Sequence, residues 1–263
     1  MANVPDALVE AREVRFGYTG GAAVVAGVSL ALGRGMLGAL IGPNGSGKST
    51  LIRLLAGILT PTRGSVLFDG APLPALRRRE LARRVAYVPQ AAPIAFPFTA
   101  LEVVLTGRSP YSSGFHFEGE RDCAKALRAL EAVGALRLRD RRMTELSGGE
   151  RQLVTVARAL ATEPVCLLMD EPSAGLDLKH RAALIRLLGR LRDRDGLTAL
   201  VVTHDLQLLD PEFDRLFALR SGALVAEGKP QELLRDAELQ SIFDDTHVRA
   251  TRVGGRTFVW SES

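Results

Sequence analysis

The segment Gly42-Pro43-Asn44-Gly45-Ser46-Gly47-Lys48-Ser49-Thr50 fits the pattern G-x-x-x-x-G-K-S/T of a phosphate-binding loop, also called Walker A. Its glycines lack Cβ atoms, so the backbone can turn sharply and point successive N–H groups into one concavity. A helix that follows directly adds the positive end of its dipole, which favours a phosphate chain. We therefore expect a nucleotide, with Lys48 on its β- and γ-phosphates and the Ser49 hydroxyl on Mg²⁺.

The residues on either side of this loop predict a strand and a helix. The run 38–41 is short and apolar, which is typical of a buried strand. Apolar residues recur at helical spacing after the loop: Leu51, Leu54, Leu55 and Ile58. The motif indicates a nucleotide phosphate, but by itself it does not distinguish a kinase, a GTPase and a motor.

Composition narrows the class of protein. Of 263 residues, 46% are hydrophobic, which is enough for a core and argues against global disorder. No 18-residue apolar run and no opening signal sequence occur, so we expect a soluble, cytosolic polypeptide. Cys166 lies in an apolar run, and we interpret it as a reduced core cysteine.

The chain is basic, with a formal net charge of +4. Its arginines are scattered, with short clusters at 77–79, 83–84 and 137–142, and no aromatic residues alternate with them. A solvated basic surface is the favoured interpretation. Contact with lipid headgroups or nucleic acid is the alternative.

Polar residues follow four predicted strands, at the point where each strand ends. The four strands end as follows: 38–41 in the phosphate loop, 85–88 before Gln90, 165–169 before Asp170 and Glu171, and 200–203 before His204. In open α/β sheets, ligands bind beyond the carboxyl ends of the strands. We therefore expect these four ends to converge on one nucleotide.

A second anion-binding helix start lies at Leu146-Ser147-Gly148-Gly149-Glu150. Ser147 and Glu150 form the pattern S-x-x-E, a capping box that opens a helix over 151–161. The two glycines leave the start of this helix bare of side chains, which suits an anion. One chain therefore carries two phosphate-binding helix starts.

Aromatic residues stand at two places where they suit a ligand or a partner. Tyr18 precedes the phosphate loop, and it suits either stacking on adenine or a half-buried place in a strand. The segment 91–118 is rich in proline and aromatic residues, among them Phe96, Phe98 and Tyr111, and it is low in charge. Exposed aromatics there would form a docking surface. Packing of a small subdomain fits the composition equally well.

The remaining segments predict ordinary elements. We expect β-structure over 8–35, a strand with a hairpin turn over 65–70, and helices over 77–84 and 120–134. A hairpin over 221–228, a helix from Pro230 to about Phe243 and a short β-tail over 244–263 complete the chain. Packing against the core is the default expectation for the tail.

Taken together, these motifs resemble the ATP-binding cassette (ABC) ATPase family over nearly the whole chain. The match comprises Walker A at 42–50, a Q-loop glutamine at Gln90, the LSGGE signature at 146–150, Walker B at 166–170 with Glu171, a D-loop at 173–177 and a switch histidine at His204. The signature is close to unique to this family. The resemblance implies an α/β fold: a P-loop NTPase (RecA-like) core with a mostly parallel sheet, an N-terminal antiparallel β-subdomain and an inserted α-helical subdomain.

The resemblance also implies a division of the chain. The range 1–263 would be one ABC ATPase domain. Residues 1–90 and 158–225 would form the core with its β-subdomain, 91–157 the helical subdomain with the signature, and 226–263 a C-terminal helix and β-tail.

The resemblance assigns roles to residues at the site. Glu171 would polarise the attacking water and His204 would contact the γ-phosphate. Ser49, Gln90 and Asp170 would hold Mg²⁺. The residues that bind ATP in the same chain would be Tyr18, Gly42, Asn44, Gly45, Ser46, Gly47, Lys48, Ser49 and Thr50. Two cassettes would pair head to tail as a homodimer, so that Ser147, Gly148 and Gly149 of one face the γ-phosphate held by the other.

Residues 96–111 are similar to the cassettes of bacterial importers for ferric siderophores, haem and cobalamin, most of all in Gly107-Arg108-Ser109-Pro110-Tyr111. In such systems this region receives a helix of the membrane permease, which implies docking by Phe96, Phe98, Arg108 and Tyr111. The implied partners are permease subunits and, indirectly, a periplasmic or surface substrate-binding protein, with no nucleic acid. The implied location is the cytoplasmic face of the inner membrane.

Two other functions remain as alternatives to an importer ATPase. One is a soluble ABC ATPase without a permease, acting in cofactor assembly or in nucleic-acid or translation work. The aromatic segment 96–117 and the absence of a long arm or inserted domain disfavour it. The other is a non-catalytic regulatory cassette, which is disfavoured because Lys48, Asp170, Glu171 and His204 are all present.

Overall fold

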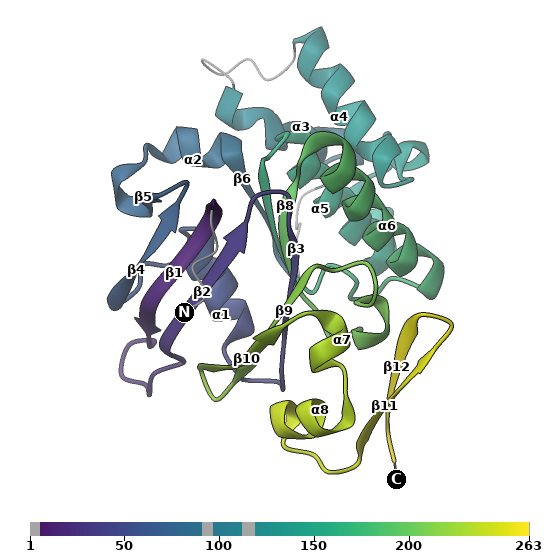
Figure 1. Cartoon of the computed structure of the whole chain (residues 1–263). Coiled ribbons are helices and arrows are strands. Elements are labelled where there is room, and N and C mark those ends of the chain that lie inside the picture. Colours follow the sequence, from purple (N-terminus) through teal and green to yellow (C-terminus); the bar gives the residue numbers. More distant parts are fainter. Residues whose placement is uncertain (1–5, 91–96, 112–118, 263) are drawn as a thin grey trace.

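The computed structural model describes residues 6–90, 97–111 and 119–262. Within these ranges the strands form a six-stranded sheet, a four-stranded sheet and a two-stranded hairpin. Figure 1 shows the four-stranded sheet beside the central one, a group of helices at the top of the view and the hairpin at the lower right.

The central sheet has the strand order β10-β9-β3-β8-β7-β6. Its strands are β3 (Leu37–Ile41), β6 (Val85–Val88), β7 (Cys166–Asp170), β8 (Thr198–Val202), β9 (Arg215–Arg220) and β10 (Ala223–Gly228). Neighbouring strands pair in parallel, except β9 with β10. Every residue of β3, β7 and β8 is buried, because helices and the second sheet cover both faces. Cys166 is among these buried residues, as expected.

The second sheet is antiparallel, with the order β2-β1-β4-β5. Its strands are β1 (Ala7–Phe16), β2 (Val25–Gly33), β4 (Arg63–Phe68) and β5 (Ala71–Pro72), followed by η1 (Leu73–Ala75) and α2 (Arg78–Arg84). Helix α1 (Lys48–Leu55) packs between the two sheets, since Leu51 and Leu54 share one buried cluster with Val28 and Leu168. Of the apolar residues noted after the phosphate loop, Leu51, Leu54 and Leu55 therefore form the face that joins the sheets, whereas Ile58 lies beyond the end of α1 and is 54% exposed.

Helices form a separate group around the signature. The group comprises α3 (Ala100–Leu105), η2 (Thr106–Tyr111), α4 (Glu120–Ala132), η3 (Leu136–Leu138), η4 (Met143–Glu145) and α5 (Gly148–Ala161). Helix α6 (Leu178–Asp195) then leads back to the sheet and ends at Gly196, which has a positive φ of 67°. The predicted class, a mostly parallel core with an antiparallel N-terminal sheet and inserted helices, is confirmed.

The C-terminal region differs from the expected single helix. After β10 the chain forms α7 (Pro230–Leu233), α8 (Asp236–Phe243), β11 (Val248–Val253) and β12 (Arg256–Ser261). A short helix, η5 (Leu206–Leu208), lies earlier, between β8 and β9. The helix predicted over 230–243 is interrupted because Leu234 and Arg235 leave the helical conformation, with ψ angles of 54° and 154°. The predicted β-tail is a hairpin.

The hairpin is attached through Asp210, a carboxylate that is 1% exposed. One oxygen of Asp210 accepts a 2.9 Å hydrogen bond from Thr257 in β12, and the other accepts a 2.6 Å bond from Gln231 in α7. This buried anchor fixes the tail to the segment that follows His204.

Arg108 was expected to dock a partner, and its burial contradicts that expectation. Its side chain is 4% exposed. It donates to Asp122 in α4 at 2.9 Å and to the carbonyl of Ala161 at the end of α5 at 2.7 Å. Its guanidinium also lies 4.0 Å from the centre of the Tyr111 ring. Arg108 therefore locks η2 onto two helices of the same chain.

Tyr111 and Gly107 also hold η2 against the neighbouring helices. The Tyr111 hydroxyl donates to the carbonyl of Thr162 at 2.9 Å, so the ring is used inside the chain. A Cβ atom on Gly107 would lie 2.1 Å from the carbonyl oxygen of Arg158, so only glycine allows η2 to approach α5 this closely. The Gly107–Tyr111 run thus packs the helical group, and docking by Tyr111, which is partly exposed, stays a prediction.

Replacing Arg108 with leucine should lower the free energy of unfolding by about 2–4 kcal/mol, because Asp122 and the Ala161 carbonyl lose a charged donor. Urea unfolding followed by circular dichroism measures this. Arg139→Leu is the control, since Arg139 forms an exposed pair with Asp140 and its loss should leave the urea unfolding curve close to that of wild type. Equal small losses for both variants would contradict a structural role for Arg108.

Candidate functional site

The phosphate loop lies where the two sheets meet, and two of its glycines are required there. A Cβ atom on Gly42 would lie 2.0 Å from the carbonyl oxygen of Leu219 in β9. A Cβ atom on Gly47 would lie 2.5 Å from the carbonyl oxygen of Val24, just before β2. Both glycines have positive φ angles, 138° and 99°. The loop is therefore held between the sheets by backbone contacts that no larger residue permits.

The loop provides donors that suit a chain of phosphates. Lys48 is buried, and its ammonium donates to the carbonyls of Gly42 and Pro43, each at 2.9 Å, so it spans the concavity. This burial lowers the pKa of Lys48. The Ser46 hydroxyl is buried without a hydrogen-bond partner among the described residues, and no side chain caps the first turn of α1. These groups fit an anion with several oxygens, as a triphosphate has.

Ser49 and Asp170, predicted as metal ligands from separate motifs, lie in contact. The Ser49 hydroxyl donates to Asp170 Oδ1 at 2.9 Å, and the Asp170 side chain is 0% exposed. Burial raises the pKa of Asp170, while the bond from Ser49 acts to lower it. A hydroxyl and a carboxylate beside a phosphate site are the oxygen ligands that Mg²⁺ prefers, so these residues fit the ion.

Glu171 lies between the two other predicted residues. One of its oxygens accepts a 2.8 Å hydrogen bond from the Gln90 amide, and the other lies 2.9 Å from His204 Nε2. Its φ of 48° is unusual for a residue other than glycine and is typical of residues held at functional sites. Gln90 thus contacts Glu171 through its nitrogen, which leaves its amide oxygen as the atom to bind a metal.

The ends of three parallel strands produce this arrangement. Gln90, Glu171 and His204 follow β6, β7 and β8, which are adjacent in the sheet. The side chain of Glu171 is 22% exposed, so water can reach it. A carboxylate held beside a histidine at the edge of a phosphate loop can orient water for attack and accept its proton.

The signature forms the expected capping box. Ser147 Oγ accepts from the Glu150 amide at 3.2 Å, and Glu150 accepts from the Ser147 amide at 3.1 Å. The two glycines differ in their surroundings. A Cβ atom on Gly148 would meet open space, whereas one on Gly149 would lie 2.9 Å from the carbonyl oxygen of Gly175 in the D-loop. Gly148 therefore presents the bare helix start, and Gly149 packs the signature against the D-loop of its own chain.

Tyr18 stands beside the phosphate loop. The residue is 48% exposed, and its hydroxyl lies 3.4 Å from Thr50 Oγ1 in α1. Phe16 supports the ring edge-on at a centroid distance of 5.0 Å. An exposed ring fixed next to the loop suits stacking on a base.

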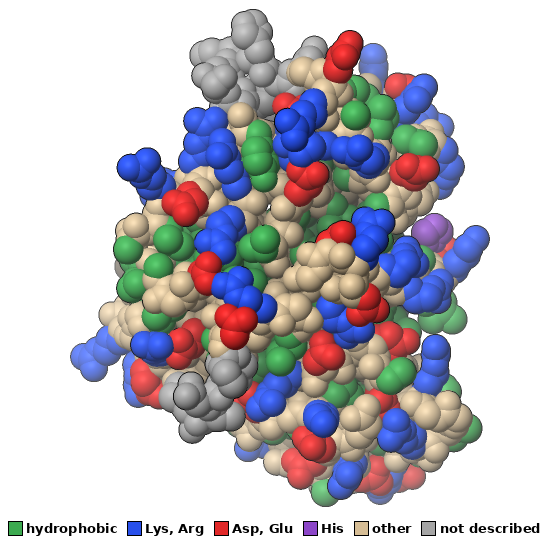
Figure 2. All heavy atoms as spheres, turned by 45° about the horizontal axis from the view of Figure 1, so that its top comes forward, with side chains coloured by type: hydrophobic (Ala, Val, Ile, Leu, Met, Phe, Trp, Pro, Cys, Tyr) green, Lys and Arg blue, Asp and Glu red, His purple; other side chains and the backbone are tan. Residues whose placement is uncertain are grey.

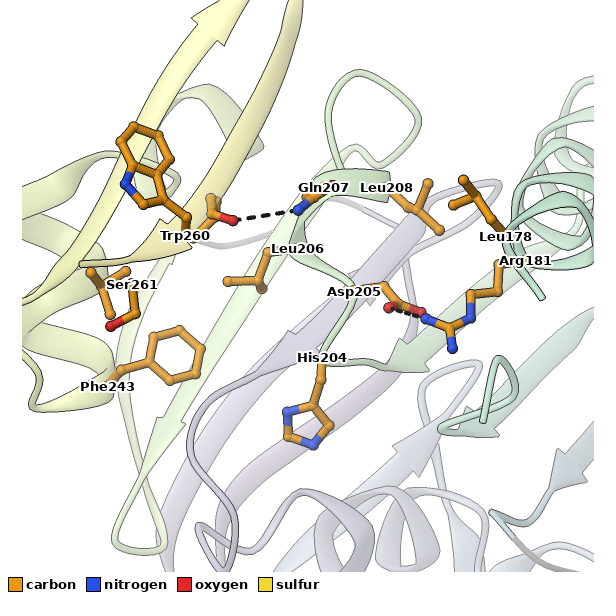
Figure 3. Close-up of a pocket in the computed structure, with 12 residues that line it drawn as sticks. Leu178, Arg181, His204, Asp205, Leu206, Gln207, Leu208, Phe243, Trp260 and Ser261 are labelled. Atoms are coloured by element: carbon orange, nitrogen blue, oxygen red, sulfur yellow. Dashed lines mark hydrogen bonds and ion pairs between the residues drawn. The ribbon is translucent and has the colours of Figure 1, made fainter. Parts of the chain in front are cut away.

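Sequence reasoning missed Asp205 and the C-terminal hairpin as neighbours of His204. Asp205 accepts from Ser173 of the D-loop at 2.7 Å and from Arg181 of α6 at 2.9 Å. Figure 3 shows a pocket that extends from His204 past Leu206 to Trp260 of β12. The only sequence signal that placed Asp205 near the site was its position after His204 at the end of a strand. No sequence signal placed Trp260 near His204.

The docking residues have mixed outcomes. Phe96 lies outside the described residues. Phe98 is 50% exposed next to α3, while Arg108 and Tyr111 are packed as described above. In Figure 2, Lys and Arg side chains are spread among acidic and apolar ones over the face shown. Among the described residues, no helix has both the length and the apolar character needed to cross a membrane.

Comparison with curated proteins finds ATP-binding proteins of hemin and cobalamin import. The chain is 42% identical to the hemin import ATP-binding protein HmuV of Nocardia farcinica, covering 82% of this chain and 74% of that protein. It is 41% identical to HmuV of Streptomyces coelicolor, covering 86% and 80%. It is also 39% identical to the cobalamin import ATP-binding protein BtuD of Halobacterium salinarum, covering 80% of this chain and 52% of that protein.

Solved structures show the same fold. A dimeric bacterial ABC transporter cassette, MJ0796, superposes with a TM-score of 0.77 at 31% identity, covering 84% of this chain and 98% of that chain. The same coverage, TM-score and identity hold for its post-hydrolysis state bound to ADP and Pi. An inward-facing putative metal-chelate type ABC transporter has a TM-score of 0.79 at 26% identity, covering 97% and 96%.

The model of the ABC transporter family matches residues 25–174, a range that includes the phosphate loop, the signature and Glu171. The ATP-binding motifs, their convergence at one edge of the sheet and the relatives agree. The chain belongs to the ABC transporter family and is an ATP-binding, ATP-hydrolysing cassette.

Proposed function

We propose that this chain is the ATPase subunit of an importer for an iron complex, either haem or a ferric siderophore, or for cobalamin. The single observation that carries the ATPase part is the contact of Glu171 with both Gln90 and His204 beside the phosphate loop. The names of the relatives, hemin import and cobalamin import proteins, support the direction and the class of cargo.

The geometry suggests how each residue acts on ATP. The loop amides and Lys48 would hold the phosphates in line with a water on Glu171. Glu171 would take a proton from that water, and His204 would donate to the γ-phosphate as charge develops. Mg²⁺, held by Ser49, Asp170 and the Gln90 oxygen, would supply a positive charge that neutralises the phosphates.

A head-to-tail homodimer would complete the site. The sequence has one phosphate loop and one signature, so two copies would form two composite sites. Gly148 presents an open helix start of the kind that binds phosphate, and it would face the γ-phosphate held by the second copy. The dimeric cassette among the structural relatives supports this arrangement.

The helical group would be the part that receives the permease. Phe98, which is 50% exposed next to α3, would be one of the residues at that contact. We retain the proposed division of the chain, in which 91–157 would be the helical subdomain, 1–90 and 158–225 the core with its β-subdomain, and 226–263 the C-terminal part. The chain would lie on the cytoplasmic face of the membrane, and a binding protein on the other side would deliver cargo to the permease.

Glu171→Gln should lower ATP turnover by about 10²–10⁴-fold, because the amide cannot accept a proton from water. ATP binding should persist, and the variant should form an ATP-dependent dimer on gel filtration. The control is Glu145→Gln, which changes an exposed carboxylate paired with Arg141. A monomer at all ATP concentrations would contradict the dimer, and undiminished turnover would contradict the role of Glu171.

The two signature glycines should respond differently to alanine. Gly148→Ala should leave the free energy of unfolding within about 1 kcal/mol of wild type, since its Cβ meets open space, yet abolish the ATP-dependent dimer of the Glu171→Gln protein. Gly149→Ala should cost about 1–3 kcal/mol through its contact with Gly175. If the protein with both Gly148→Ala and Glu171→Gln still formed a dimer at the ATP concentration that dimerises Glu171→Gln alone, this would argue against binding of ATP by the signature of the second copy.

Purification of the tagged chain from detergent-solubilised membranes tests the importer proposal. We expect a polytopic permease in a two-to-two complex. Phe98→Ser should reduce the recovered permease at least several-fold, while Phe258→Ser, which changes a comparably exposed ring on β12, should not. A chain recovered from the cytosol alone, or with a soluble partner, would favour an ABC ATPase that works without a permease.

A further inference from the structure

The second carboxylate oxygen of Asp170 has its own set of contacts, separate from Ser49. Tyr87 of β6 places its hydroxyl 3.4 Å from Asp170 Oδ2. Arg53 of α1 places Nε 3.3 Å from the same Tyr87 hydroxyl and Nη2 3.9 Å from Asp170 Oδ2. Neither Tyr87 nor Arg53 belongs to a motif of the phosphate site. Both nevertheless converge on the buried carboxylate at its centre.

The directions of these hydrogen bonds follow from chemistry. A guanidinium only donates, so the Tyr87 oxygen accepts from Arg53. The single proton of the Tyr87 hydroxyl is then free to be donated to Asp170 Oδ2. Ser49 donates to the other oxygen, Oδ1. One oxygen of the carboxylate is thus engaged by a residue of α1 and the other by a residue of β6, which fixes the rotation of the carboxylate plane.

The surrounding elements make this arrangement rigid. Strands β6 and β7 pair in parallel, with Tyr87 opposite Leu168, so the phenol reaches the end of β7 from the adjacent strand. Arg53 lies on the same helix as Ser49, which starts at the phosphate loop. A buried carboxylate without such donors would be free to rotate, and it would also be costly to keep charged.

We propose that Tyr87, supported by Arg53, is a positioning residue that aims Asp170 Oδ1 toward Ser49 and the metal position. This inference rests on the proposed Mg²⁺ site. Tyr87 would act through Asp170 and would touch neither the nucleotide nor the ion. Outer partners of this kind typically change metal affinity by about 10–100-fold when they are removed.

The test measures metal binding directly. Mn²⁺, a paramagnetic substitute for Mg²⁺, is added to the full chain with a non-hydrolysable ATP analogue, and bound Mn²⁺ is read by electron paramagnetic resonance. Tyr87→Phe should weaken Mn²⁺ binding by about 10-fold, while affinity for the analogue in EDTA stays at the wild-type value. Arg53→Gln should shift binding in the same direction by a smaller factor, because its guanidinium is partly exposed.

Controls separate the two levels of the proposal. Arg12→Gln also removes an arginine that pairs with a carboxylate, but at an exposed place on β1, and should leave Mn²⁺ binding unchanged. Asp170→Asn tests the metal site itself. If wild type and Asp170→Asn bind Mn²⁺ equally, the metal site fails and the inference with it. If only Asp170→Asn weakens binding and Tyr87→Phe and Arg53→Gln match wild type, the positioning role is overturned. If Tyr87→Phe does not fold, the Mn²⁺ affinity of Arg53→Gln decides whether the positioning role holds.

Discussion

The arrangement of the site depends on the close approach of the phosphate loop to the backbone of both sheets. Gly42 lies against Leu219 of the central sheet, and Gly47 lies against Val24 at the start of β2. The backbone also bonds directly, because the Gly222 amide donates to the carbonyl of Ser46 at 3.0 Å. Side chains at these glycines would push the sheets apart. The loop therefore joins the sheets and shapes the anion site through the same contacts.

Once the loop is fixed, the parallel sheet supplies the chemistry. Strands β6, β7 and β8 end at the same edge, so residues far apart in the chain arrive side by side. Glu171 continues beyond β7 with its amide bonded to the carbonyl of Val202 in β8 at 3.0 Å. This bond and the positive φ of Glu171 turn its side chain toward His204 and Gln90. The register of two neighbouring strands thus sets the position of the carboxylate.

The parts that sequence predicts well are those whose cause is local. The apolar strands with polar ends and the Ser147–Glu150 capping box depend on a few adjacent residues, and all were found. Arg108 was misjudged because its burial depends on Asp122 and Ala161, which arrive from two other helices. The attachment of the tail could not be predicted for the same reason, since its anchor is the distant and buried Asp210. The contact of Tyr87 with Asp170 could not be predicted either, because it depends on the pairing of β6 with β7.

The contacts within one chain connect the signature to the switch histidine through the D-loop. Gly149 packs on Gly175, and Ser173, two residues earlier, donates to Asp205. Asp205 follows His204 directly, so a shift of the signature relative to the core would act on the D-loop and then on His204. In the proposed dimer, each signature would meet the nucleotide of the other copy. Binding at one composite site would therefore bear on the hydrolytic residues of the second through packed backbone and the partly buried, hydrogen-bonded carboxylate of Asp205.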